Sequence, residues 1–111
     1  MELDERPIDE KYSLEILKTW KTSTLGAWYL NSYIPAQQDE TRRGLVERII
    51  KVIQQRPTAE RREVFVDIAS HVALAELGGR TVERENLIGM LAHYYSEVLQ
   101  GGLREQFYSK R

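Results

Sequence analysis

The chain has 111 residues, of which 41% are hydrophobic and 30% charged, so it can build one hydrophobic core but not two, and it is not a disordered chain. The formal net charge of −1 excludes a strong overall attraction to nucleic acid or to an anionic membrane. Cysteine is absent, which excludes disulfides, thiol nucleophiles and thiolate metal sites and favours a cytoplasmic location.

The N-terminal segment is acidic and carries Glu2, Asp4 and Glu5 before Pro7. It has no apolar stretch of the kind found in signal peptides. We expect a flexible acidic arm over residues 1–8 and a single helical domain over residues 9–111. No apolar run approaches the roughly 20 residues of a membrane span, so no membrane association is expected.

The first helical region is predicted over residues 9–34, where apolar side chains recur at helical spacing. We expect one long helix that can kink at residues 22–24, with a break into two helices there as the alternative, because Thr and Ser side chains compete for backbone hydrogen bonds. Beyond Ser23, apolar side chains surround the helix axis almost completely, so this half must be buried in the core or against a partner. Pro35 is expected to end the region.

Gly26 interrupts this otherwise good helical stretch. A glycine inside a helix costs about 1 kcal/mol relative to alanine. Close approach of another helix would offset that cost, and a solvent-facing glycine is the alternative.

The second and third helices are predicted over residues 40–55 and 59–77. The second has an apolar stripe roughly 160° wide and follows Asp39, which can cap it. In the third, the apolar residues of 64–77 span an arc of roughly 220°, more than twice the stripe of about 100° that a surface helix needs. We therefore expect helix 59–77 to be the central helix, covered on several sides.

A fourth helix is predicted after Thr81, ending at the glycine pair 101–102, with a short tail that can add a further turn. Short connections make successive helices roughly antiparallel. No stretch alternates with period two for long enough to predict a strand. The expected fold is all-α, a compact bundle of three to five helices.

Few residues suggest catalysis. His71 and His93 each have a carboxylate four residues away, but such pairs are ordinary on exposed helix faces, and His93 is expected far from the apolar face of its helix. Glu76 falls inside the apolar arc of the third helix, although it lies within one turn of the helix end, where its side chain can reach water. We expect no enzymatic activity, no cofactor and no metal site.

Large aromatic residues are numerous for so short a chain, and Tyr and Trp suit the edges of cores and interfaces between chains. Four short helices cannot cover all the apolar surface of residues 25–34 and 59–77, so we expect a homodimer that acts as a regulatory or adaptor module for protein–protein interaction. The predicted interface comprises Leu25, Trp28, Tyr29, Tyr33 and Ile34, together with Tyr94 and Tyr95.

Nucleic-acid binding is the alternative. Basic residues concentrate over residues 42–62, and segment 71–90 has the outline of a helix-turn-helix. Glu83 and Glu85 lie where phosphates would approach, and helix–glycine–helix segments also join ordinary packed helices, so a protein partner is preferred. In this alternative the contacts would come from Arg56, Arg61, Arg62, Arg80 and Arg84.

Overall fold

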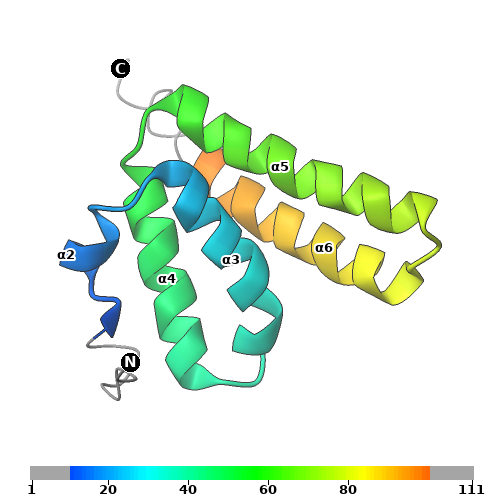
Figure 1. The fold of residues 1–111 in the computed structure, drawn as a ribbon, viewed down its shortest axis with the longest axis horizontal. Coiled ribbons are helices and arrows are strands. Elements are labelled where there is room, and N and C mark those ends of the chain that lie inside the picture. Colours follow the sequence, from blue (N-terminus) through cyan, green and yellow to red (C-terminus); the bar gives the residue numbers. More distant parts are fainter. Residues whose placement is uncertain (1–10, 101–111) are drawn as a thin grey trace, which may run out of the picture.

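The computed structural model describes residues 11–100, all of whose regular elements are helices (Figure 1). The expected all-α bundle is confirmed. The expected arm over 1–8 and the tail after residue 102 lie outside the described residues. The elements are α2 (Leu14–Leu17), α3 (Thr22–Ala36), α4 (Glu40–Gln54), α5 (Thr58–Leu77), α6 (Thr81–Tyr94) and the π-helical η1 (Tyr95–Gln100).

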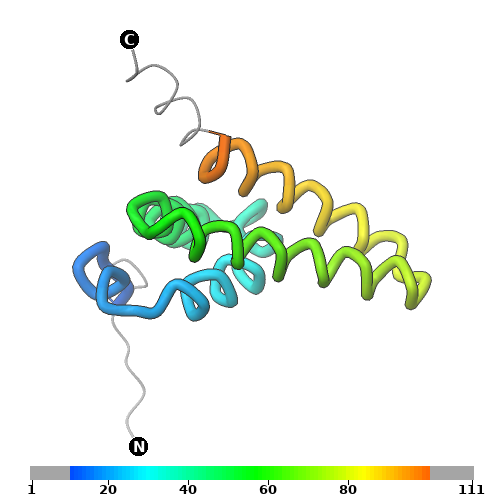
Figure 2. The backbone as a smooth tube through the Cα atoms, turned by 90° about the horizontal axis from the view of Figure 1, so that it is seen from above, coloured from blue at the N-terminus to red at the C-terminus, as the bar shows by residue number. Residues whose placement is uncertain are grey.

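Two helical hairpins build the fold. α3 packs against α4, and α5 packs against α6, with the members of each pair running in opposite directions (Figure 1). The far end of the α5–α6 pair extends beyond α3 and α4 in both views (Figures 1 and 2). η1 continues α6 and contacts α4 and α5, while α2 packs on α4.

The first helical region consists of two helices rather than one. α2 is a single turn capped by the Ser13 side chain, and the chain leaves the helix before restarting at Thr22. Partners from the α4–α5 corner stabilise this break: Thr22 donates a hydrogen bond of 2.5 Å to the Glu60 carboxylate, and Arg56 donates one of 2.9 Å to the Lys18 carbonyl. These partners are 38 residues apart in the sequence, so helical periodicity cannot distinguish a kink from a break and only tertiary contacts decide.

α3 continues one residue beyond Pro35 and ends at Ala36. The predicted end of the helix at residue 34 is therefore two residues too early. A proline in the last turn removes a single backbone donor, which the helix tolerates.

Three aromatic rings hold α2 against α3. The ring centroid of Tyr12 lies 5.7 Å from that of Trp20 and 5.0 Å from that of Trp28, and the two indoles are 5.3 Å apart. Tilted and edge-on arrangements at this spacing are the favourable ones for aromatic rings. The interrupted start of the chain is thus packed onto the body of the bundle.

The core lies between α4 and the helices that face it. α4 is strongly amphipathic, and its predicted stripe is the buried one, made of Leu45, Val46, Ile49, Ile50, Val52 and Ile53. The other helices contribute buried apolar residues from their inner sides, chiefly Leu25, Tyr29, Ile68, Leu87, Met90, Tyr94 and Val98.

α5 contacts α3, α6 and η1, but the described chain covers one side of it rather than several. Its buried residues are Val64, Ile68 and Ala75, whereas Val66 and Leu77 are exposed. α5 is therefore apolar on two opposite sides, and one of these sides has no neighbour within residues 11–100.

Gly26 lies where α3 approaches α5. A Cβ atom at this position would be 3.0 and 3.1 Å from the two methyl carbons of Val64, which is tighter than ordinary van der Waals contact. The close helix approach predicted as one explanation for this glycine is confirmed. None of the helices within residues 11–100 is long and apolar enough to cross a membrane.

Candidate functional site

The predicted aromatic interface is in part the chain's own core. Leu25, Tyr29 and Tyr94 are fully buried, which leaves no surface on them for a partner and corrects the prediction for these three residues. The reason is that α4, α5 and α6 all pack on α3. A helix that is apolar nearly all round is here covered by three neighbours of the same chain.

The other four residues of that predicted interface are partly exposed, and three of them pack against different neighbours. Trp28 belongs to the aromatic cluster with Tyr12 and Trp20, Tyr33 lies 5.2 Å from the His93 ring, and Tyr95 lies 6.1 Å from the Phe65 ring. Ile34 is exposed near the end of α3.

His93 faces α3 rather than the solvent side of its helix, contrary to expectation. Its Nδ1 lies 2.7 Å from the hydroxyl oxygen of the buried Tyr29, which is also 3.2 Å from the carbonyl oxygen of Met90. The helical wheel of α6 assigns the His93 side of the helix to solvent because that side is not apolar, but α3 packs on it. Burial, together with Tyr33, Tyr94 and Glu97 nearby, raises the pKa of Tyr29 far above its ordinary value.

Tyr94 is the second buried phenol. Its hydroxyl donates a hydrogen bond of 2.6 Å to the carbonyl of Arg61 and so joins η1 and α6 to the start of α5. Burial raises its pKa as well, although the Arg61 guanidinium opposes the shift. Both phenols are protonated at neutral pH, and both act as hydrogen-bonding parts of the core.

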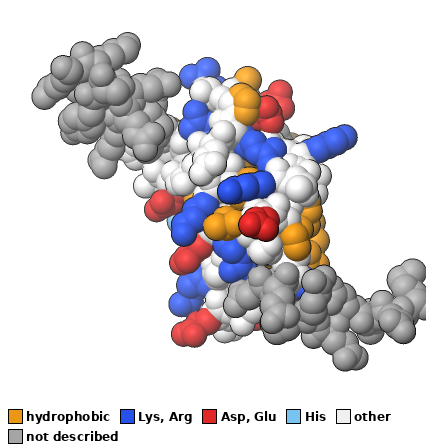
Figure 3. Space-filling model, turned by 90° about the vertical axis from the view of Figure 1, so that its left-hand side faces the viewer, with side chains coloured by type: hydrophobic (Ala, Val, Ile, Leu, Met, Phe, Trp, Pro, Cys, Tyr) orange, Lys and Arg blue, Asp and Glu red, His pale blue; other side chains and the backbone are white. Residues whose placement is uncertain are grey.

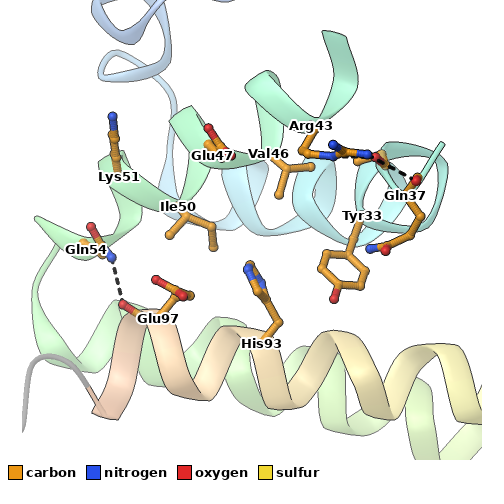
Figure 4. A pocket seen from close by; sticks show the side chains of 11 residues that line it. Tyr33, Gln37, Arg43, Val46, Glu47, Ile50, Lys51, Gln54, His93 and Glu97 are labelled. Atoms are coloured by element: carbon orange, nitrogen blue, oxygen red, sulfur yellow. Dashed lines mark hydrogen bonds between the residues drawn. The ribbon is translucent and has the colours of Figure 1, made fainter. Parts of the chain in front are cut away.

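A groove of about 510 Å³ runs between α4 and the α6–η1 segment. Its apolar residues are Ala36, Val46 and Ile50, and Figure 4 shows the His93 and Glu97 side chains pointing into it while the Lys51 ammonium points away. Its remaining lining residues are Tyr33, Gln37, Arg43, Glu47 and Gln54.

Two polar side chains of this groove are bonded to backbone carbonyls of neighbouring elements. Arg43 donates hydrogen bonds of 3.3 Å to the carbonyls of Ala36 and Gln37, where it caps α3, and Gln54 donates one of 2.8 Å to the Glu97 carbonyl. Acidic and basic side chains alternate along the rim. Within residues 11–100 no group of three or more His, Cys, Asp or Glu is placed to hold a metal ion.

The other residues considered for chemistry occupy ordinary helix-surface positions. His71 bonds through Nδ1 to the backbone carbonyl of Asp67 at 2.9 Å rather than to its carboxylate. Glu76 is exposed and forms an ion pair with Arg84 across the α5–α6 hairpin. The apolar arc around Glu76 is therefore not a buried environment.

Two of the five arginines proposed for nucleic-acid contact form hydrogen bonds to other segments of the same chain. Arg56 bonds to Lys18 and Thr22, and Arg61 donates to the carbonyl of Val98 at 3.3 Å and to the Thr58 hydroxyl at 2.8 Å. The face on the side of α2 and α4 shows Lys and Arg interleaved with acidic and apolar side chains rather than a continuous basic surface (Figure 3).

Arg80 and Arg84 both pair with carboxylates: Arg80 with Glu83 at 2.5 Å, and Arg84 with Glu76 and with Glu85, the latter at 3.0 Å. The helices that flank them form an antiparallel hairpin (Figure 1). A helix-turn-helix instead sets its two helices at about 90–120°. Segment 71–90 is thus an ordinary helical hairpin, turned by Gly79 at a φ of 69°.

The described surface carries one apolar feature that follows a helix axis. Val66, Leu74 and Leu77 of α5 are 61%, 57% and 85% exposed, and Val82 at the start of α6 is 76% exposed. At 100° per residue, Val66, Ala73 and Leu77 lie within roughly 40° of one another, opposite the buried Val64, Ile68 and Ala75. We call this strip the outer face of α5, consisting of Arg62, Val66, Ala69, Ser70, Ala73 and Leu77.

The sequence feature that indicates the outer face of α5 is the wide apolar arc of helix 59–77. The arc predicts that the helix needs cover on more than one side, but not which side the same chain covers. The prediction placed the interface on the aromatic residues of α3 because Tyr and Trp suit interfaces between chains. Comparison of the chain with protein-family models, with curated proteins and with solved structures finds no match.

Proposed function

We propose that this protein is a non-enzymatic protein-interaction module of regulatory or adaptor type that self-associates through the outer face of α5. The observation that carries the proposal is the exposure of Val66 and Leu77 on the side of α5 that faces away from the core. The absence of cysteine fits a reducing compartment, so we propose the cytoplasm as its location.

Single exposed apolar residues are normal on protein surfaces and need no explanation. Here Val66, Ala73 and Leu77 share one helix face, and Leu74 lies beside it. Removing apolar surface from water contributes about 25 cal/mol per Å². Contiguous apolar surface of this kind is typical of protein interfaces, and a two-fold dimer is the commonest way for one chain to cover it.

The other readings have less support. An enzyme has less support because Arg43 and His93, two groove residues suited to anion binding or proton transfer, are bonded to the end of α3 and to Tyr29. Nucleic-acid binding would need arginines free for phosphates, but four of the five proposed ones bond within the described chain.

The test is the mass in solution, measured by size-exclusion chromatography with light scattering at micromolar concentration. The wild-type chain is expected to elute with twice the monomer mass of 13.0 kDa. Leu77→Lys should yield a monomer with an unchanged circular dichroism spectrum, because this side chain contacts little of its own chain. Ile34→Lys, which changes an exposed apolar residue outside the outer face, is the matched control and should remain dimeric.

A wild-type monomer would overturn the self-association. A Leu77→Lys variant that dimerises as tightly as wild type would overturn the assignment of the face. Loss of the dimer in Ile34→Lys as well as in Leu77→Lys would point to a different interface, on α3.

A further inference from the structure

We infer that the dimer forms by antiparallel packing of two α5 helices about a two-fold axis that passes near Ala69 and Ser70. This inference rests on the proposed function, since it specifies how the self-association occurs. It follows from the spacing, the side-chain sizes and the charges of the outer face, and from the space around α5.

The spacing of the outer face is that of a helix–helix seam. Its residues recur at intervals of three and four from Arg62 to Leu77, as in the apolar seam of a coiled coil. At 1.5 Å per residue the seam is about 22 Å long. Ser70 can be buried in it without an unpaired hydroxyl, because its Oγ already donates a hydrogen bond of 2.9 Å to the Val66 carbonyl.

Side-chain size favours the antiparallel direction. The centre of the seam is small, at Ala69, Ser70 and Ala73, and the largest apolar residue, Leu77, lies at one end. An antiparallel pair centred on residues 69 and 70 places Val66 against Ala73 of the second copy and Leu77 against the aliphatic stem of Arg62. A parallel pair would place Leu77 against Leu77 and Ala73 against Ala73, which packs the ends and leaves the centre open.

Charge favours the same direction. Arg62 and Glu76 lie within roughly 40° of each other around the helix, on one flank of the seam. In an antiparallel pair, equivalent flanks face each other, so Arg62 lies beside Glu76 of the second copy, twice by symmetry. Arg62 is exposed and forms no hydrogen bond or ion pair with any residue of 11–100, and Glu76 remains exposed beside Arg84.

A parallel pair would instead set residues of equal number at the same height, so Arg62 of one copy would lie about 21 Å along the helix axis from Glu76 of the other. The two could not pair, and the complementarity of charge across the interface would be lost. Arg62 and the carboxylate 14 residues later thus favour the antiparallel direction.

Space around α5 permits the approach of a second copy. α5 forms one edge of the molecule in Figure 1, and in Figure 2, seen from above, no described element crosses in front of it. The hairpin extends beyond α3 and α4, so the pairing does not require these helices to move.

Cysteine cross-linking tests the register. The wild-type chain has no cysteine, so any disulfide in a single-cysteine variant must join the introduced residues of two copies. Ser70→Cys lies next to the proposed axis and should form a disulfide-linked dimer under mild oxidation, since close helices bring such positions within disulfide range. Ala92→Cys, exposed on α6, is the matched control and should remain uncross-linked. A wild-type dimer whose Ser70→Cys variant does not cross-link overturns the pairing of α5 but not the self-association, whereas a wild-type monomer overturns both.

Charge exchange tests the direction independently. Arg62→Glu alone and Glu76→Arg alone should each weaken the dimer by about tenfold or more, because each places two like-charged pairs across the seam. Mixed together they should form a heterodimer in which both pairs are opposite in charge, and the double variant Arg62→Glu/Glu76→Arg should dimerise as the wild type does. Single variants Arg62→Glu and Glu76→Arg that both dimerise as tightly as the wild type would overturn the antiparallel direction, because residues 62 and 76 would then not face each other across the seam.

Discussion

Gly26 sets the distance between α3 and α5 through a single missing methyl group. Its neighbour Val64 is buried, and a β-branched side chain has little rotamer freedom to move aside. The helix-breaking tendency of this glycine is therefore the cost of a close helix crossing.

We expect Gly26→Ala to lower the free energy of unfolding by about 1 kcal/mol, because overpacking of about 1–3 kcal/mol exceeds the gain in helix propensity of about 1 kcal/mol. Gly89→Ala is the matched control. It lies in α6 with no atom within 4 Å of the added Cβ, so it should raise the free energy of unfolding by up to about 1 kcal/mol. Urea titrations at one protein concentration measure both, and equal stabilisation by the two alanines would refute the tight contact.

The buried phenols predict loss of stability in alkali. Burial raises the pKa of Tyr29 and of Tyr94 above the value of 10.0 that the unfolded chain approaches. Above pH 10 the unfolded state loses protons that the folded state keeps, so the free energy of unfolding falls as pH rises, by about 1.4 kcal/mol per pH unit for each tyrosine. Below pH 10 the two groups are protonated in both states and produce no slope.

Tyr94→Phe should reduce the alkaline slope by about 1.4 kcal/mol per pH unit. At neutral pH it should cost about 1 kcal/mol, because the hydrogen bond to the Arg61 carbonyl is lost. Tyr95→Phe, on the exposed tyrosine of η1, is the control and should leave the slope unchanged. Denaturant unfolding between about pH 10.5 and pH 12 gives the slopes, and parallel curves for wild type and Tyr94→Phe would contradict the prediction.

At the scale of elements, a polar cluster joins the α2–α3 break to the α4–α5 corner. Thr22 is buried, donates to Glu60 at 2.5 Å and accepts a hydrogen bond of 3.3 Å from Arg56. Arg56 in turn holds the carbonyl of Lys18. Groups from two segments far apart in sequence, residues 18–22 and 56–60, thus fix where one helix stops and the next begins.

Thr22→Val keeps the shape of the side chain and removes its hydroxyl. We expect it to lower the free energy of unfolding by about 1.5–3 kcal/mol, because a hydrogen bond to a charged group is lost and the Glu60 carboxylate loses its donor. Thr22→Ser retains the hydroxyl and should cost less than Thr22→Val. Tryptophan fluorescence during urea unfolding is a suitable measurement, since Trp20 and Trp28 belong to the adjoining aromatic cluster, and a Thr22→Val variant as stable as wild type would rule out this role.

Helices differ in how far their sequences predict them. α4 was predicted closely, with its Asp39 cap and its buried stripe, because it is amphipathic and only one side can face the core. α3 and α5 carry apolar residues around most of their circumference, so periodicity predicts a helix without indicating its inward side. The prediction that His93 faces solvent is wrong for a related reason, since α3 covers a flank of α6 that the helical wheel assigns to solvent.

At the scale of the whole molecule, two hairpins leave one helix with a second apolar side. The described chain covers α3 with α4, α5 and α6, but it covers α5 on one side only. The sequence predicted excess apolar surface on two helices: in the described chain it is covered on α3 and remains exposed on α5. In the proposed dimer, the second copy covers the uncovered side of α5.

Composition and helical periodicity alone determined three properties: the all-α fold, the approximate ends of most helices, and an apolar surface that is large for the length of the chain. These properties depend only on local spacing and on counts of side chains. Only the tertiary structure decided which apolar sides meet each other, since that depends on contacts between residues far apart in sequence, such as Gly26 with Val64 and Thr22 with Glu60. The candidate interface follows from those contacts: packing buried the aromatic side of α3 and left Val66 and Leu77 of α5 in water.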